Sequence, residues 1–185
     1  MEELYWEKFN NEHIENIEKY VLNYIKTIDR NAKIIVGCDS SNNHSKKTVF
    51  AITVVFYNEQ KRHGAHVVFA KIKTSKIKDV SVKIWKEAEY VFNIASLLDK
   101  TLRGEYYFNF DKNYYDNSTP TKLVEVHVDI NPKRNTKNGR KLTNNKSNLV
   151  YPEIMGWLCS CGFKVVSKPY SFGATNSADA ICSPS

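Results

Sequence analysis

The sequence predicts an α/β protein with a five-stranded mixed sheet, helices on both faces and one extra helix at the N-terminus. Three observations support this prediction. Three runs rich in β-branched and aromatic residues follow one another within residues 33–73, and two further strand-like runs alternate with helical periodicities after them. The connection between the second and third runs is short and polar. A strand hairpin followed by helix-strand alternation is typical of a mixed sheet whose later strands are added by crossover connections.

Residues 11–30 form the first predicted element. Apolar side chains recur there at a helical period, at Ile14, Ile17, Tyr20, Val21, Tyr24, Ile25 and Ile28. This spacing predicts an amphipathic helix that covers one edge or face of the sheet.

Three strands are predicted next, at residues 33–38, 48–57 and 64–73, because each run is rich in β-branched or aromatic residues. The polar connection at residues 58–63 is short enough for an antiparallel hairpin. We therefore expect the first three strands of the sheet to be antiparallel.

A long helix is predicted for residues 80–100, where apolar residues step by four and three positions. These residues are Ile84, Ala88, Val91, Ala95 and Leu98. Residues 101–121 contain many tyrosine, phenylalanine, asparagine and aspartate residues without a clean period. They are predicted to be an excursion from the domain.

Residues 122–130 alternate strictly and predict a fourth strand. Valines and an isoleucine lie on one face of it. The other face carries Leu123, Glu125, His127 and Asp129.

The last third of the chain predicts a helix, a short strand and a final helix. The helix at about 148–161 is ended by Gly162, which suits a helix C-cap. A fifth strand follows at residues 163–167. Ser171 is a candidate N-cap for a last helix that runs towards Cys182.

The composition is that of a globular protein, with 185 residues of which 42% are hydrophobic and 25% charged. We expect a single domain over residues 1–185, made of the helix at 11–30 and a core at 33–183. No apolar run approaches the ~20 residues that span a bilayer, and the N-terminus lacks the apolar segment of a secretory signal. A cytoplasmic protein without a membrane span is expected.

The four cysteines are too scattered for a disulfide framework. They are Cys38, Cys159, Cys161 and Cys182. One residue separates the middle two, fewer than in a zinc knuckle. Buried thiols are therefore expected.

The net charge of +7 favours a polyanionic partner, and nucleic acid is the partner we expect. Basic residues gather in segments 71–86 and 133–146, and the second segment also lacks acids. It suits contact with a phosphate backbone, although a solvated loop accounts for it equally well. Its candidate nucleic-acid-binding residues are Lys133, Arg134, Lys137, Arg140 and Lys141. Lys168, near the carboxyl end of the fifth strand, is a further candidate, with an ordinary surface lysine as the alternative.

Two aspartates are placed where parallel strands end. Asp39 follows the first strand, and Asp129 lies near the end of the fourth. If these strands are parallel neighbours, both acids emerge at the carboxyl edge, where open α/β sheets bind ligands. Two close carboxylates repel unless a cation joins them, and Mg²⁺ or Mn²⁺ suits such oxygen ligands. For Asp39, hydrogen bonding to turn amides is the alternative.

Two further acids lie on predicted helices. Glu87 falls on or beside the apolar stripe of the long helix, whereas Glu89 is rotated away from it. Asp179 lies among small residues that allow the last helix to approach the sheet closely. The alternatives are that Glu87 reaches the surface and that Asp179 is an ordinary exposed acid.

The order of the elements, with four acids placed on the first strand, the long helix, the fourth strand and the last helix, resembles the ribonuclease H-like superfamily. More narrowly, four segments resemble those of the uncharacterised family often labelled YkuK, found in bacteria and phages: VGCDSS, HVDINPKRN, YPEIMGWLCSCGF and SKPYSFGATNSAD. The resemblance covers roughly residues 33–182 and leaves the first helix outside the superfamily core.

The resemblance implies a nuclease that cleaves phosphodiester bonds in RNA, RNA–DNA hybrid or structured DNA with two divalent ions, Mg²⁺ or Mn²⁺. It assigns the catalytic and metal-binding positions to Asp39, Glu87, Asp129 and Asp179. Glu89 replaces Glu87 if the helix register differs. His127 is either a proton shuttle or a packed strand histidine.

A second function remains open at this point. A non-catalytic nucleic-acid-binding or assembly module on the same scaffold is favoured by the aromatic residues within 106–115, which suit base stacking. Aromatic residues in such a segment are also typical of local packing or of a surface that binds a partner protein.

Overall fold

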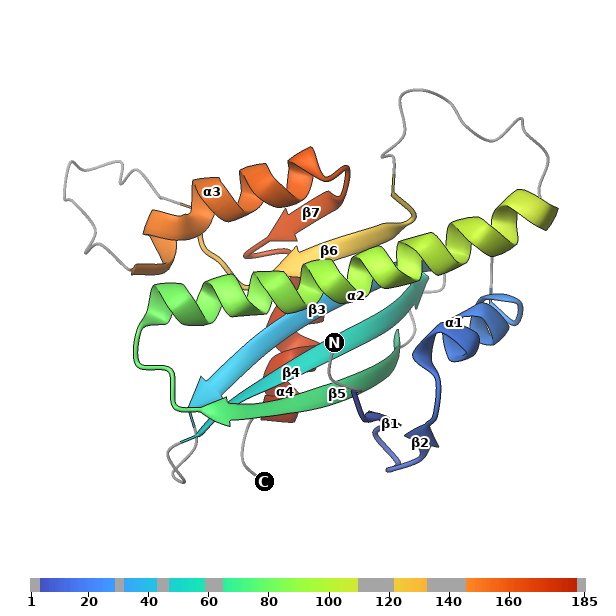
Figure 1. Ribbon diagram of the computed structural model, residues 1–185, viewed down its shortest axis with the longest axis horizontal. Coiled ribbons are helices and arrows are strands. Elements are labelled where there is room, and N and C mark those ends of the chain that lie inside the picture. The colour runs from blue at the N-terminus through green and yellow to red at the C-terminus, as the bar shows by residue number, and fades with distance from the viewer. Residues whose placement is uncertain are drawn as a thin grey trace.

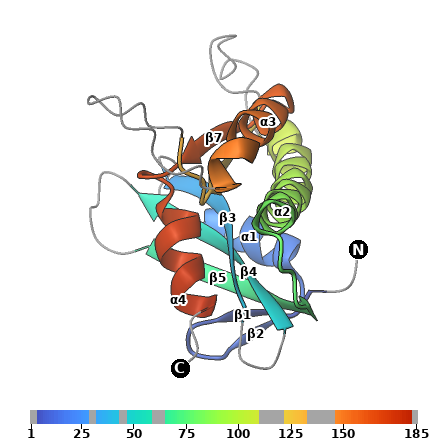
Figure 2. The ribbon, with the colours of Figure 1, turned by 90° about the vertical axis from the view of Figure 1, so that its left-hand side faces the viewer.

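The computed structural model contains one seven-stranded sheet with helices on both faces (Figure 1). It describes residues 4–28, 32–42, 47–58, 65–109, 122–132 and 146–182. The strand order is β2-β1-β5-β4-β3-β6-β7. Figure 2 shows α1, α2 and α3 against one face of the sheet and α4 against the other. The α/β class and the mixed sheet are confirmed.

The elements follow one another along the chain as β1 (Trp6–Lys8), β2 (His13–Ile14), α1 (Ile17–Ile25), β3 (Ala32–Asn42), β4 (Lys47–Asn58), β5 (Ala65–Ser75), α2 (Val80–Asn109), β6 (Val124–Val128), α3 (Lys146–Ser160), β7 (Lys164–Ser167), the π-helix η2 (Gly173–Ala178) and α4 (Asp179–Cys182).

The pairing of the central strands confirms the predicted topology. β3, β4 and β5 are antiparallel neighbours, whereas β6 runs parallel to β3 and β7 runs parallel to β6. The parallel pairing of β3 with β6 ends at Cys38 and Val128. The residues that follow these two positions therefore emerge at the same edge of the sheet.

The prediction of five strands is wrong, because β1 and β2 extend the sheet beyond β5. They have three and two residues, too few to show an alternating pattern in the sequence. Trp6 and Ile14 are nevertheless buried, so the pair closes that edge of the core. The first helix is correspondingly shorter than predicted. It begins at Ile17, after Asn16 accepts a hydrogen bond from the Lys19 N–H at 2.8 Å.

Two other element boundaries differ from the prediction. β3 continues to Asn42 because β4 pairs with it over its whole length, so Asp39 lies inside the strand and not after it. α2 continues to Asn109, through part of the predicted excursion. Buried Leu102 extends its apolar face, and Arg103 Nε donates to Asp99 one turn earlier at 2.9 Å. The rest of the excursion, residues 110–121, lies outside the described residues.

The last helix also starts differently. The predicted helix capped by Ser171 is instead a π-helix, η2, whose cap residue Phe172 makes no side-chain hydrogen bond, and α4 continues it. η2 presses directly on β3, because a Cβ added at Gly37 would lie 2.6 Å from the backbone N of Ala174. Thr53 Oγ1 on β4 donates to the Gly173 carbonyl at 3.0 Å. This contact places α4 across the sheet face.

The main core lies between the sheet and α1, α2 and α3, and includes Val36, Ile52, Leu98 and Ile154. A smaller cluster lies under α4. Within the described ranges, no helix has both the length and the apolar character of a membrane span.

Candidate functional site

Asp39 lies on β3, one residue beyond the end of its pairing with β6. Cys38 lines a pocket against α2, so the alternation of the strand turns Asp39 towards the face that η2 and α4 cover. Its Oδ1 accepts the Ser40 N–H at 2.7 Å, a local bond like that expected of a turn aspartate. Burial raises the pKa of Asp39, and the negative charge of Asp179 adds to that rise.

Glu87 on α2 reaches the same edge from the other face of the sheet. It is 6% exposed and accepts a hydrogen bond from Ser40 Oγ. Burial raises its pKa to about 8, with a further contribution from the charge of Asp39. Glu89 is exposed and lies 4.0 Å from Lys86 Nζ. The helix register therefore presents Glu87 and not Glu89 to the site.

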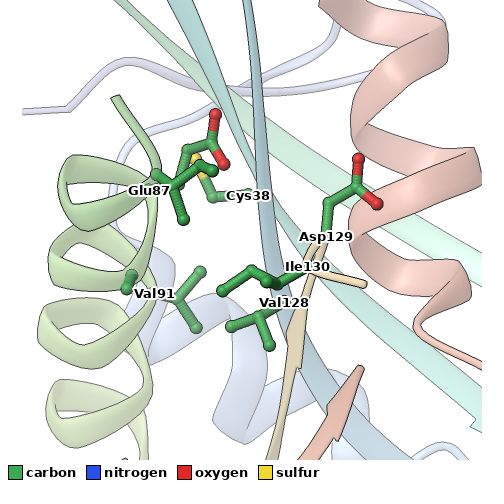
Figure 3. A pocket seen from close by; sticks show the side chains of 8 residues that line it. Cys38, Glu87, Val91, Val128, Asp129 and Ile130 are labelled. Atoms are coloured by element: carbon green, nitrogen blue, oxygen red, sulfur yellow. The ribbon is translucent and has the colours of Figure 1, made fainter. Parts of the chain in front are cut away.

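Asp129 follows the last residue of β6 and shares the pocket with Glu87. Figure 3 shows the two carboxylates on opposite sides of this pocket, both directed to the same end of it and not towards each other. Asp129 Oδ1 is buried and accepts no hydrogen bond of good geometry, although Lys168 Nζ lies 2.5 Å from it. The positive charge of Lys168 therefore balances the negative charge of this carboxylate.

Asp179 is the first residue of α4 and is exposed. It is linked to the other acids through its charge effect on Asp39. This exposed position fits a metal ligand and fits an ordinary exposed acid equally well, and these are the two alternatives that the sequence left open.

The four acids thus come from four elements that meet at one edge, but they are not equally close. Asp39 interacts electrostatically with both Glu87 and Asp179, whereas Asp129 is held by Lys168. In the described part of the chain, no group of three or more His, Cys, Asp and Glu has the spacing of a metal site. The donor chemistry fits Mg²⁺ or Mn²⁺, and the buried Asp129 oxygen without a hydrogen bond fits a ligand position. With the present spacing, the four carboxylates would have to move closer together to bind an ion.

Two polar neighbours of the acids were missed by sequence reasoning. Ser40 faces α2, opposite to Asp39, and bonds to Glu87. Lys83 Nζ donates to the Ser40 carbonyl at 3.2 Å, and its charge lowers the pKa of Asp39 and of Glu87 against the larger effect of burial. A sequence signal existed for Lys83, which lies one helical turn before Glu87.

His127 is packed inside the fold. Its side chain is 1% exposed, its Nδ1 accepts the Gly173 N–H at 3.1 Å, and its Nε2 lies 2.9 Å from Glu125 Oε1. Because Nδ1 accepts a bond, Nε2 carries the proton and donates to Glu125. Of the two roles open from the sequence, the packed strand histidine fits these contacts. His127 joins β6 to η2.

Of the predicted nucleic-acid-binding residues, only Lys168 lies in the part of the chain that the structure describes. Lys133, Arg134, Lys137, Arg140 and Lys141 lie outside the described residues, as do residues 110–115 of the aromatic segment. Lys168 is described, and it contacts Asp129.

The prediction of buried thiols is only partly right. Cys38 is buried, Cys161 is half-buried and Cys159 is exposed, and these three cysteines form no disulfide bond.

Comparison with known proteins gives one family. A family model described as ribonuclease H-like matches residues 12–183, so the match includes α1 as well as the expected core. No curated protein and no solved structure matches the chain. The narrower YkuK resemblance stays a prediction. Because the family match spans nearly the whole chain and agrees with the mixed sheet, the protein belongs to the ribonuclease H-like family.

Proposed function

We propose that this protein is a metal-dependent nuclease that cleaves phosphodiester bonds in RNA, RNA–DNA hybrid or structured DNA. The observation that carries the proposal is the meeting of β3 and α2 at this edge, where Ser40, the neighbour of Asp39 on β3, donates a hydrogen bond to the buried carboxyl of Glu87. Asp129 emerges at the same edge from the neighbouring parallel strand. Family membership supports a nuclease-like scaffold.

The four carboxylates are the residues that would hold the metal. Asp39, Glu87, Asp129 and Asp179 offer the hard oxygen ligands that Mg²⁺ and Mn²⁺ prefer. When two such ions are bound, they activate a water for in-line attack and stabilise the leaving oxygen of the phosphodiester.

The protein's own groups orient these carboxylates. Ser40 fixes the Glu87 carboxyl by a hydrogen bond, and Lys83 places a positive charge near Glu87 and Asp39. His127 holds η2 against β6, which keeps the start of α4, and with it Asp179, near the edge. Rigid support of this kind is what a multi-ligand site requires.

Charge supports a nucleic-acid substrate. The chain has 27 basic and 20 acidic residues, and the segment 133–146 gathers basic residues without acids. Lysine and arginine contacts to phosphates provide affinity without selecting sequence. We assign the phosphate contacts to the segment 133–146. We also propose that the protein acts in the cytoplasm, where nucleic acid is available.

The test is a cleavage assay with labelled RNA, RNA–DNA hybrid and duplex DNA, each incubated with Mg²⁺, Mn²⁺ or a chelator. Wild-type protein should cleave at least one substrate with metal and none with chelator. Asp39→Asn and Asp129→Asn should abolish cleavage, whereas the control Glu89→Gln, on the exposed side of α2, should leave it unchanged. Intact substrates in every wild-type reaction would overturn the proposal.

One observation favours a second candidate, a non-catalytic nucleic-acid-binding or assembly module. Within the described ranges, the acids do not reach metal-site spacing, and a lysine already compensates Asp129. Calorimetric titration of Mn²⁺ separates the two functions. On the nuclease hypothesis, Asp39→Asn removes metal binding while nucleic-acid affinity stays equal or rises, because a negative charge is lost. On the module hypothesis, the substitution has little effect on either.

A further inference from the structure

Lys168 is anchored beside the carboxylate that it contacts. It lies in the turn after β7, and its backbone N–H donates to the carbonyl of Ile130 at 3.3 Å. That bond places Lys168 next to the segment that carries Asp129, and its Nζ lies 2.5 Å from Asp129 Oδ1. Backbone and side chain thus both contact the end of β6, so the pair is a built feature of the fold and not a chance meeting of two surface chains.

The ion pair is partly withdrawn from water. The Lys168 side chain is 30% exposed and that of Asp129 is 17% exposed. The contacted oxygen is buried and accepts no hydrogen bond of good geometry. The ammonium group of Lys168 therefore balances the negative charge of this oxygen, as a bound divalent ion would do at a carboxylate.

We propose that Lys168 is an internal counter-ion that occupies the cation position at Asp129 in the metal-free protein and must be displaced when a divalent ion binds. The inference rests on the proposed function, because it assumes that these acids bind a divalent ion. Its consequence is that Lys168 weakens metal binding, since each binding event has to break the Lys168–Asp129 pair.

Calorimetric titration of Mn²⁺ into wild type and Lys168→Met tests this role. The variant should bind Mn²⁺ about tenfold more tightly or better, because Asp129 is left without its counter-ion. Lys164→Met is the matched control. It removes the same charge from β7, but Lys164 pairs with Glu125 at 2.6 Å and not with a candidate ligand. Its Mn²⁺ affinity should stay within about twofold of wild type.

A second measurement uses the wild-type protein and does not depend on the variant folding. Lysine acetylation by a mild reagent, followed by mass spectrometry, reports the reactivity of each ammonium group. Saturating Mn²⁺ should make Lys168 several-fold more reactive and leave Lys164 unchanged. Equal reactivity of Lys168 with and without bound Mn²⁺ would overturn the displacement.

The outcomes separate this inference from the proposed function. Equal Mn²⁺ affinity in wild type and Lys168→Met, with binding lost in Asp129→Asn, overturns the counter-ion role and leaves the metal site standing. Absence of Mn²⁺ binding in both proteins overturns the metal site and the counter-ion role together.

Discussion

Ser40 and Glu87 join β3 to α2 by a hydrogen bond from the serine hydroxyl to the buried carboxyl. The bond forms one residue beyond Asp39, whose side chain lies on the opposite face of the strand. β3 therefore presents Asp39 to one layer of the fold and fixes Glu87 in the other. Ser40 is a positioning residue for the candidate site.

Replacing Ser40 by alanine should lower the free energy of unfolding by about 1–3 kcal/mol, because the buried Glu87 carboxyl loses its hydrogen-bond partner. Urea denaturation in the presence of a chelator measures this loss. Ser160→Ala, which removes an exposed bond to the Trp157 carbonyl, should change stability by less than about 0.5 kcal/mol. Equal losses of unfolding free energy in the two variants would show that the bond from Ser40 stabilises the fold no more than an exposed serine bond does.

Glu87 should make the stability of the metal-free protein fall as pH rises. Burial raises its pKa to about 8 in the folded state, above its ordinary value of 4.5. The folded protein therefore keeps a proton that the unfolded chain releases, so the contribution of Glu87 is fully present below about pH 4.5 and is lost between there and pH 8. Denaturation in chelator from pH 5 to pH 9 measures this slope.

The variant Glu87→Gln isolates the effect of this carboxyl. It should have a flatter stability profile than wild type and should be the more stable of the two at the alkaline end, because no buried group then resists ionisation. Glu89→Gln, at an exposed position of the same helix, should keep the wild-type slope. Parallel profiles for wild type and Glu87→Gln would contradict the prediction.

Glu125 should make the stability of the protein fall as pH decreases, which is the opposite of the effect of Glu87. Burial raises its pKa, but hydrogen bonds from His127 and Lys164 outweigh that effect and lower the pKa to about 2. Its contribution to stability is therefore present above the ordinary value of 4.5 and is lost as pH falls towards 2. Acid unfolding followed by circular dichroism measures it. Glu125→Gln should be less stable at neutral pH and should lose less stability than wild type on acidification.

The parts of the fold that were predicted are those with long, regular patterns. The strands at β3, β4 and β5 and the helix α2 each repeat their pattern over many residues, and Glu87 was placed correctly because Ile84 and Val91 define the buried stripe around it. β1 and β2 are too short to carry a pattern. Their burial depends on the edge of β5, which no local signal reveals.

The contacts around the candidate residues could not be predicted from the sequence. Asp39 was predicted to follow a strand, but it lies inside β3, because β3 pairs with β4 through the turn-like residues after it. The contact of Lys168 with Asp129 joins the turn after β7 to the end of β6. Such a contact depends on the assembled sheet, so residue type and spacing could suggest only that Lys168 lies near the edge.

Gly37 provides the most direct test of the close contact between β3 and η2. An added Cβ would lie 2.6 Å from Ala174 N and from Gly173 C, and these are backbone atoms that cannot turn aside. Gly37→Ala should therefore lower the free energy of unfolding by about 1–3 kcal/mol and displace η2, which leads into α4 and Asp179. Cleavage, measured under conditions in which the variant is folded, should fall with it, because a displaced η2 shifts the start of α4, which carries Asp179. Gly156→Ala is the matched control, since nothing lies within 4 Å of the added Cβ and alanine favours the α3 helix. It should be as stable as wild type or more so, with full cleavage activity. A stable, active Gly37→Ala protein would mean that the approach of η2 to β3 does not position Asp179.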